Sequence, residues 1–206
     1  MKNMILAVLA CAAPLSLWAG IAEKMSQRAG ELKGLYAEFE QVREISLLEE
    51  KAVSKGFLVF DDSDGIRWQT NEPFKAAMIS KGGKVSQFEF EDGRWKRLKF
   101  DPGFPIGKIL GEIRAVAAGD LAGRERAYDS SESGGALVLT PAHEAARQFV
   151  SRITVKPRPD FSSPESIRID FPGGDSTTIT FGRTVANPPD AARAFETDPV
   201  SDYPAK

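Results

Sequence analysis

Hydrophobic and polar residues alternate with a period of two along most of the chain. Such alternation is typical of a β-strand that buries one face, because successive side chains of a strand point to opposite sides. Several of the runs are separated by Gly-Gly or Asp-Gly pairs, which suit tight hairpin turns. The pattern predicts an antiparallel meander of about eleven strands, at residues 35–41, 53–60, 66–70, 76–80, 85–90, 95–100, 124–128, 136–140, 149–155, 166–171 and 177–181.

A few segments have the longer spacing of a helix instead. In residues 20–33 apolar side chains recur every three or four positions, which is the pattern of an amphipathic helix. A second apolar stripe with this spacing follows Pro105 and ends before Gly119. Residues 141–147 predict one or two further helical turns.

The balance of strands and helices indicates the fold class. A meander of eleven strands is expected to roll up, because flat open sheets of that size are rare. Two to three amphipathic helices can cover one side of such a sheet but not both. The sequence therefore predicts a mainly β (α+β) fold, an incomplete antiparallel β-barrel of about eleven strands with a helical lid. The interior is either a packed core or an apolar cavity, and the pattern suits both.

The first nineteen residues have the layout of a secretory signal peptide. Lys2 is their only charge, an apolar stretch follows, and the small residue Ala19 precedes Gly20. Pro14 and Ser16 interrupt the stretch, whereas a membrane anchor needs roughly 20 unbroken apolar residues. We expect cleavage after Ala19 and export to the periplasm.

A second interpretation of the leader makes Cys11 a lipidated N-terminus. The residues Val8-Leu9-Ala10-Cys11 loosely resemble a lipoprotein-processing box. Leu9 is bulky where a small residue is usual, and apolar sequence continues through Trp18, so cleavage after Ala19 is the favoured prediction. At the other end, residues 187–206 are rich in Pro, Asp and Ala and predict a flexible tail. The expected organisation is a signal peptide at 1–19, a half-barrel domain at 20–186 and this tail.

Composition narrows the function classes. The 206 residues contain 27 Lys and Arg against 29 Asp and Glu, a net charge of −2, so the chain as a whole has no positive field for nucleic acid. One cysteine excludes a disulfide framework, a thiolate zinc site and a paired-cysteine redox centre. His143, the one histidine, falls in a predicted surface turn, where it is a poor base for a Ser or Cys nucleophile. We therefore expect neither an enzyme nor a bound cofactor or metal.

One basic run contains an aromatic residue, Arg94-Trp95-Lys96-Arg97-Leu98-Lys99. As a strand edge, its charges would discourage pairing with another chain. Alternatively, Arg94, Arg97 and Lys99 form a basic rim for an anionic head group or an acidic partner.

Several motifs in residues 35–84 occur together in a recognisable order. They are Phe39-Glu40-Gln41, Gly56-Phe57-Leu58-Val59-Phe60, Ile66-Arg67-Trp68, Glu72-Pro73 and Gly83-Lys84. In this order and spacing the chain resembles the LolA-type periplasmic lipoprotein carriers over roughly residues 21–183. The resemblance implies a half-barrel with an apolar, aromatic-lined cavity under a helical lid. It also implies a carrier that receives lipoproteins from an inner-membrane ABC transporter and passes them to an outer-membrane acceptor.

The chain departs from that family at one position. The family usually has an Arg-Pro pair just after the second strand, where the arginine holds the lid by hydrogen bonds. Asp62 and Ser63 stand at the matching positions here, so the mechanism of the lid and the cargo are both in question.

The first functional hypothesis is a monomeric, non-enzymatic carrier that shields acyl chains in transit from the inner to the outer membrane, with an inner-membrane exporter and an outer-membrane acceptor as partners. The alternative is a periplasmic sensor or scaffold that docks a protein, with its interior filled by its own side chains. For the carrier, the predicted cavity is lined by Leu35, Ala37, Phe39, Leu58, Phe60, Ile66, Trp68, Met78, Phe88, Phe90, Leu98 and Phe100 on the sheet and by Ile106, Ile109, Leu110 and Ile113 on the lid.

Overall fold

The computed structural model describes residues 20–47, 51–63, 65–99, 111, 114–116, 127–198, 200, 201 and 203. The strands are β1 (Gly34–Glu44), β2 (Ala52–Asp61), β3 (Ile66–Glu72), β4 (Ala76–Lys81), β5 (Lys84–Glu91), β6 (Arg94–Arg97), β7 (Tyr128–Ser133), β8 (Ala136–Pro141), β9 (Arg152–Pro157), β10 (Pro164–Asp170) and β11 (Ser176–Ala186). The helices are α1 (Ile21–Ala29), α3 (Glu144–Arg147) and the 3-10 helix η1 (Ala191–Phe195). Residues 114–116 are also helical.

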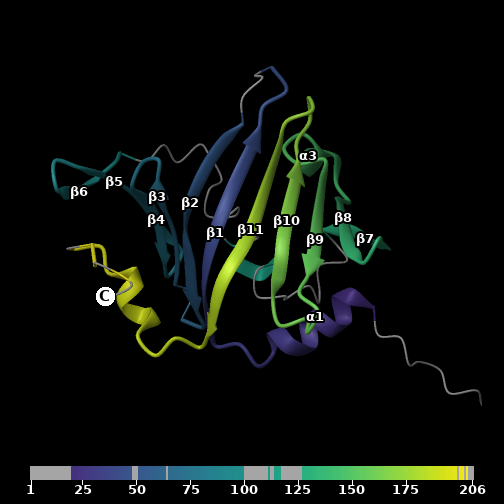
Figure 1. Cartoon of the computed structure of the whole chain (residues 1–206), viewed down its shortest axis with the longest axis horizontal. Helices are drawn as coiled ribbons and strands as arrows, with labels where there is room; N and C mark the ends of the chain where they lie inside the picture. The colour runs from purple at the N-terminus through teal and green to yellow at the C-terminus, as the bar shows by residue number, and fades with distance from the viewer. Residues whose placement is uncertain are drawn as a thin grey trace, which may run out of the picture.

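All eleven strands belong to one antiparallel sheet with the order β6-β5-β4-β3-β2-β1-β11-β10-β9-β8-β7 (Figure 1). Neighbours in the sheet are also neighbours in the chain, except at the centre. There β1 pairs with β11, with Leu35 opposite Ala186 and Glu44 opposite Ser176. These two strands, each of 11 residues, join the two halves of the chain.

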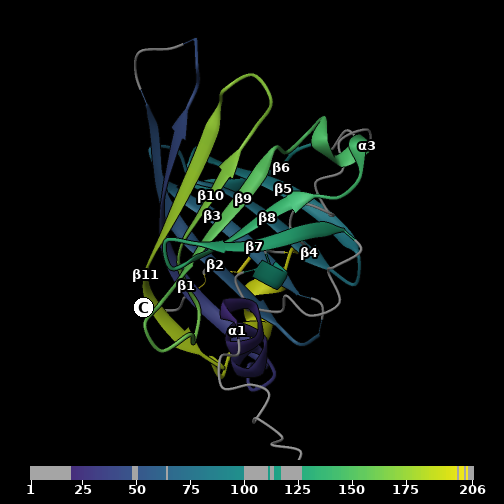
Figure 2. The same ribbon diagram turned by 90° about the vertical axis from the view of Figure 1, so that its right-hand side faces the viewer.

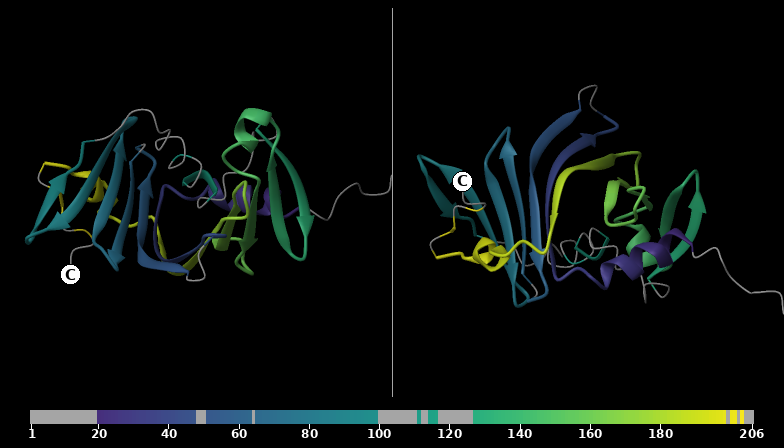
Figure 3. Two further views of the ribbon diagram at one scale, coloured as in Figure 1. Left: turned by 90° about the horizontal axis from the view of Figure 1, so that it is seen from above. Right: turned by 60° about the horizontal axis from the view of Figure 1, so that its bottom comes forward.

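The sheet curves into a half-barrel that stays open, with β6 and β7 as its two edges (Figure 3). Helix α1 lies across one end of it, beneath β9 and β10 in the view of Figure 1 and in front of the sheet in Figure 2. The predicted fold class, a mainly β open sheet of about eleven strands with few helices, is confirmed.

The concave face holds the larger of two apolar clusters. Met25 of α1 is fully buried there, and Val116 of the helical residues 114–116 is 4% exposed. Both pack on side chains that alternate inward from the strands, as period-two patterning requires. The buried strand members are Leu35, Ala37, Phe39, Leu58, Phe60, Ile66, Trp68, Leu137, Leu139, Ile153, Val155, Ile167, Ile179 and Phe181.

The convex face carries a second cluster, which the C-terminal segment covers. Ala194 and Phe195 of η1 are buried against Phe57, Val59 and Ile79 of the sheet. The composition of residues 187–206 predicted a flexible tail, but the structure packs its described part, outside the sheet in Figure 3. Phe195 and Tyr203 are buried with the alanines of this segment, so its few apolar side chains cover an apolar sheet face although its composition is largely polar.

A buried arginine fastens this segment to the sheet. Arg67 is 1% exposed, and its Nη1 donates to the main-chain oxygens of Ala194, at 3.2 Å, and Ser201, at 3.1 Å. Its Nε donates to Gln69 Oε1 at 3.0 Å. A buried guanidinium is tolerated only when its donors are satisfied, so these bonds link β3 to the end of the chain.

Some predicted boundaries need correction. Residues 124–126 of the strand predicted at 124–128 lie outside the described residues, and β7 begins at Tyr128 and continues through five exposed polar residues. An edge strand in solvent has no hydrophobic alternation, so the sequence could not show it. Strand β6 ends at Arg97, before the predicted Phe100, and β9 begins at Arg152 because Phe149 is exposed. Helix α1 ends at Ala29 and not at Lys33.

Candidate functional site

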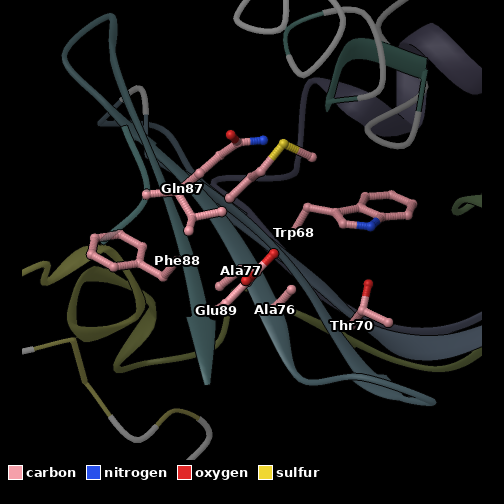
Figure 4. Close-up of a pocket in the computed structure, with 9 residues that line it drawn as sticks. Trp68, Thr70, Ala76, Ala77, Gln87, Phe88 and Glu89 are labelled. Carbon is pink, nitrogen blue, oxygen red and sulfur yellow. The ribbon is translucent and has the colours of Figure 1, made fainter. Parts of the chain in front are cut away.

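An open pocket of about 160 Å³ lies on the concave side of the sheet, over β3, β4 and β5 (Figure 4). Nine residues line it: Trp68, Thr70, Ala76, Ala77, Met78, Gln87, Phe88, Glu89 and Leu98. Six of these nine side chains are apolar.

Strand register brings the main side chains of the pocket together. Trp68 pairs with Leu58 on one side and with Met78 on the other, and Met78 pairs with Gln87. Residues paired in an antiparallel sheet point to the same face, so all of them project to the concave side. Leu98 follows β6, and its backbone N–H donates to the oxygen of Gln87 at 2.9 Å.

Trp68 connects the pocket to the concave cluster. Its ring stacks on Phe39 with 4.1 Å between the ring centroids and an interplanar angle of 27°. Only 7% of Trp68 is exposed, and this side chain both packs in the cluster and lines the pocket. The pocket is therefore an opening of the concave apolar face and not a separate surface dent.

The polar side chains of the pocket are Thr70, Gln87 and Glu89. Glu89 is exposed, and within the described part of the chain its carboxylate makes no hydrogen bond or ion pair. Lys96 pairs with it across the strands, but the Lys96 ammonium bonds to Glu91 at 2.8 Å and Asp92 at 3.0 Å. Among the described lining residues the carboxylate of Glu89 is thus the one formal charge.

The sequence-predicted cavity residues other than Phe90 fall into three groups. Trp68, Met78, Phe88 and Leu98 line the pocket. The others on the same face are buried in the concave cluster behind it, namely Leu35, Ala37, Phe39, Leu58, Phe60 and Ile66. The predicted residues Phe100, Ile106, Ile109, Leu110 and Ile113 lie outside the described residues, as does the predicted leader with Cys11.

The predicted inward direction of Phe88 and Phe90 needs correction. Phe88 belongs to the convex cluster and borders the pocket only from its strand, with its ring turned away from Trp68 in Figure 4. Phe90 pairs with Trp95, and the two rings meet edge to face at 5.3 Å. Alternation shows which residues of a strand share a face, but not which face points inward, and β5 has aromatics on its outer face.

The predicted basic rim is divided between the two faces. Arg97 lies on the convex side, where its Nη1 donates to Ser86 Oγ at 2.6 Å and its Cζ is 4.9 Å from the Phe88 ring centroid. Arg94, three residues earlier in the strand, points to the opposite face and pairs with Glu91. Lys99 is exposed beyond the end of β6. These three cations do not converge on one point.

The polar lining residues Thr70, Gln87 and Glu89 were not predicted, because apolar alternation identifies only apolar side chains. Thr70 could have been found, since it is two residues from Trp68 and shares its face. Gln87 and Glu89 required the register between β4 and β5, which the Gly82-Gly83 turn sets.

Other kinds of site have little support in the described residues. No group of three or more His, Cys, Asp or Glu side chains there is placed to hold a metal ion. The one histidine, His143, is exposed at the start of α3. None of the helices in this part of the chain has the length and apolar character needed to cross a membrane.

Solved structures share the fold at low sequence identity. A DUF1329 family protein from Desulfovibrio piger matches with a TM-score of 0.50 and 13% identity, over 88% of this chain and 96% of that one. The two proteins share a fold. No protein-family model and no curated protein sequence matches the chain.

Two solved structures with lower TM-scores have names that refer to lipoprotein sorting or to the LolA superfamily. A putative outer membrane lipoprotein-sorting protein domain from Vibrio parahaemolyticus has a TM-score of 0.45 and 12% identity, over 86% of this chain and 95% of that one. The LolA superfamily protein NE2245 from Nitrosomonas europaea has a TM-score of 0.40 and 11% identity, over 87% and 99%.

Proposed function

We propose that the protein is a carrier that binds the acyl chains of a lipid or lipoprotein on the concave face of its half-barrel. The observation that supports this most is the pocket over β3 to β5, which opens into the apolar cluster through Trp68. Burial of each methylene group is worth about 0.8 kcal/mol, so an apolar face of this kind can hold a chain without covalent chemistry.

The volume of the pocket sets a condition on this function. Its 160 Å³ is close to the size of an engineered cavity of about 150 Å³ that takes up benzene. A long acyl chain needs more room than that. Met25 and Val116 occupy the adjacent concave face, so we expect α1 and the helical residues 114–116 to move aside when a chain enters.

We further propose that the carrier works in the periplasm as a monomer, after removal of residues 1–19. In this proposal it takes its cargo from an inner-membrane exporter and passes it to an outer-membrane acceptor. The support is the signal-like leader together with the resemblance of residues 35–84 to the LolA-type carriers.

Titration with a neutral apolar dye, 1-N-phenylnaphthylamine, tests the proposal on residues 20–206. Saturable fluorescence enhancement and co-purified lipid in native mass spectrometry are expected. Ala76→Leu, which fills the pocket, should weaken dye binding several-fold. The matched control is Ala52→Leu on an exposed alanine at the start of β2, and it should bind like the wild type. A protein that binds neither dye nor lipid would refute the carrier function.

A protein-docking scaffold is the second candidate. It is favoured by the extent to which the concave face is filled by the protein's own side chains, such as Met25 at 0% exposure. A scaffold does not need a site for acyl chains. If the protein is a scaffold, filling the pocket by Ala76→Leu should leave its binding to the protein partner unchanged.

A further inference from the structure

We propose that the pocket prefers acyl ligands whose head group carries an ammonium charge over ligands with an anionic head group, and that Glu89 sets this preference. The inference rests on the proposed function, because it concerns the head group of an acyl ligand bound over β3 to β5. It gives a role to Glu89, a polar lining residue that has no part in the binding of the acyl chain itself.

The position of Glu89 gives the first part of the argument. Glu89 lines the pocket from β5, opposite Ala76 of β4. Figure 4 draws its carboxylate on the same side of the sheet as Gln87 and Trp68, whereas Phe88 between them points the other way. Within the described part of the chain no hydrogen bond or ion pair engages this carboxylate. It is available to a ligand.

The nearby cations give the second part. Lys96 lies across from Glu89, but its ammonium is held by Glu91 and Asp92 at the turn between β5 and β6. Lys75 lies on the outer face, 4.4 Å from the Phe90 ring centroid and 5.1 Å from that of Trp95. None of the described lining residues is Lys or Arg. Arg94 also shares the face of Glu89, but it lies opposite Glu91 and does not line the pocket. An anionic head group in the pocket would therefore meet Glu89 with no cation among the described lining residues.

The aromatic wall gives the third part. Trp68 presents the largest ring of the pocket on the same side as Glu89. A cation near an indole face is attracted by the ring quadrupole, and tryptophan is the strongest of the aromatic partners. A carboxylate and an indole in one apolar pocket are a suitable pair for an ammonium group. Thr70 and Gln87 add neutral hydrogen-bonding groups beside them.

Three amphiphiles with the same dodecyl chain test the preference: dodecyltrimethylammonium, dodecyl maltoside and dodecyl sulfate. Each is used below its micelle concentration to displace 1-N-phenylnaphthylamine from residues 20–206. We expect the ammonium compound to bind roughly three- to five-fold more tightly than the sulfate at low salt, since exposed charge pairs have effects of this size. The ratio should fall as salt is added, because exposed charges are screened.

Glu89→Gln is the decisive variant, and Glu72→Gln, an exposed glutamate outside the lining, is its control. In Glu89→Gln the ammonium-to-sulfate ratio should approach one while the maltoside affinity stays unchanged. In Glu72→Gln the ratio should equal that of the wild type. A preference that persists in Glu89→Gln, or a wild type that prefers the sulfate, would overturn the inference and leave the carrier function standing. Failure of all three amphiphiles to bind would instead refute the carrier function itself.

Discussion

Arg114 donates a hydrogen bond of 2.8 Å from Nη2 to the main-chain oxygen of Asp61, at the end of β2. Its Cζ also lies 5.7 Å from the ring centroid of Phe60. The contact joins the helical residues 114–116 to the sheet beside the turn that contains Asp62 and Ser63. The arginine comes from the helical residues and the acceptor from the sheet, so this hydrogen bond fastens the two together.

Replacing Arg114 should loosen this link. We expect Arg114→Ala to lower the free energy of unfolding by about 1.5–3 kcal/mol, the usual contribution of a hydrogen bond from a charged donor. If the helical residues 114–116 restrict access to the concave face, the same variant should take up 1-N-phenylnaphthylamine faster. Arg114→Lys, which keeps the charge and one donor, should lie between. Chemical denaturation and stopped-flow fluorescence give the two quantities, and unchanged uptake in Arg114→Ala would show that these residues do not control access.

Trp68 should affect both stability and binding. Because it stacks on Phe39 and is 7% exposed, Trp68→Ala should cost about 3–5 kcal/mol of stability, as for other buried aromatics. Because it also lines the pocket, the variant should bind dye less tightly under conditions where it is folded. Trp68→Phe keeps most of the packing and should lose less of both. A large fall in melting temperature with unchanged dye affinity would make Trp68 a core residue only.

The close approach of β3 to Gly56 explains why the motif Gly56-Phe57-Leu58-Val59-Phe60 in β2 begins with a glycine. The ladder between β2 and β3 shifts between Lys55 and Gly56, and a Cβ at Gly56 would overlap the main-chain oxygen of Gln69. No side chain fits without moving one strand. A glycine-to-alanine change at an unstrained position is usually mild or stabilising. We expect Gly56→Ala, in contrast, to lower the free energy of unfolding clearly. Gly111, whose Cβ would meet nothing within 4 Å, provides the control, and equal melting temperatures for Gly56→Ala and Gly111→Ala would contradict the explanation.

The strand pattern allowed most of the fold to be predicted. Ten of the predicted runs overlap substantially with strands because their alternating residues face a buried concave side, as with Leu58 and Phe60. The eleventh run, at 124–128, lies mostly outside the described residues, and β7 was not predicted from Asp129 onward because its residues there are exposed and polar. Packing of the C-terminal segment was also missed. It depends on Arg67 meeting the oxygens of Ala194 and Ser201, over a hundred residues away, and nothing local signals such contacts.

The candidate site could be predicted only in part. Trp68 and Met78 pair between β3 and β4 and lie on one face, where apolar residues alternate with polar ones along the strands. Phe88 and Phe90 were placed on the wrong side, since β5 has a partly apolar outer face as well. Glu89 looks like any surface carboxylate in the sequence. Its relation to Trp68 comes from two successive strand registers, and a single-sequence pattern does not determine these.

Alkaline pH should destabilise the protein through a buried tyrosine of the C-terminal segment. Tyr203 is 6% exposed and lies against Tyr36, with 6.3 Å between the ring centroids. Burial raises the pKa of Tyr203 from its ordinary value of 10.0 to about 12, and the negative charge of Asp190 acts in the same direction. The pKa of Tyr36 is raised as well, first by burial and then by Glu38.

The direction of the pH effect follows from which state loses the proton first. Below about pH 10 Tyr203 is neutral in both the folded and the unfolded protein, so its packing contributes fully. Between about pH 10 and 12 the unfolded chain ionises Tyr203 while the folded one does not, so the free energy of unfolding falls as pH rises. We expect the melting temperature to fall over this window and to fall less in Tyr203→Phe, which has no proton to lose. The phenolate absorbance of the wild type should rise together with unfolding. Identical slopes for the two proteins between pH 10 and 12 would mean that Tyr203 titrates freely and that the C-terminal segment is not packed over the convex face in solution.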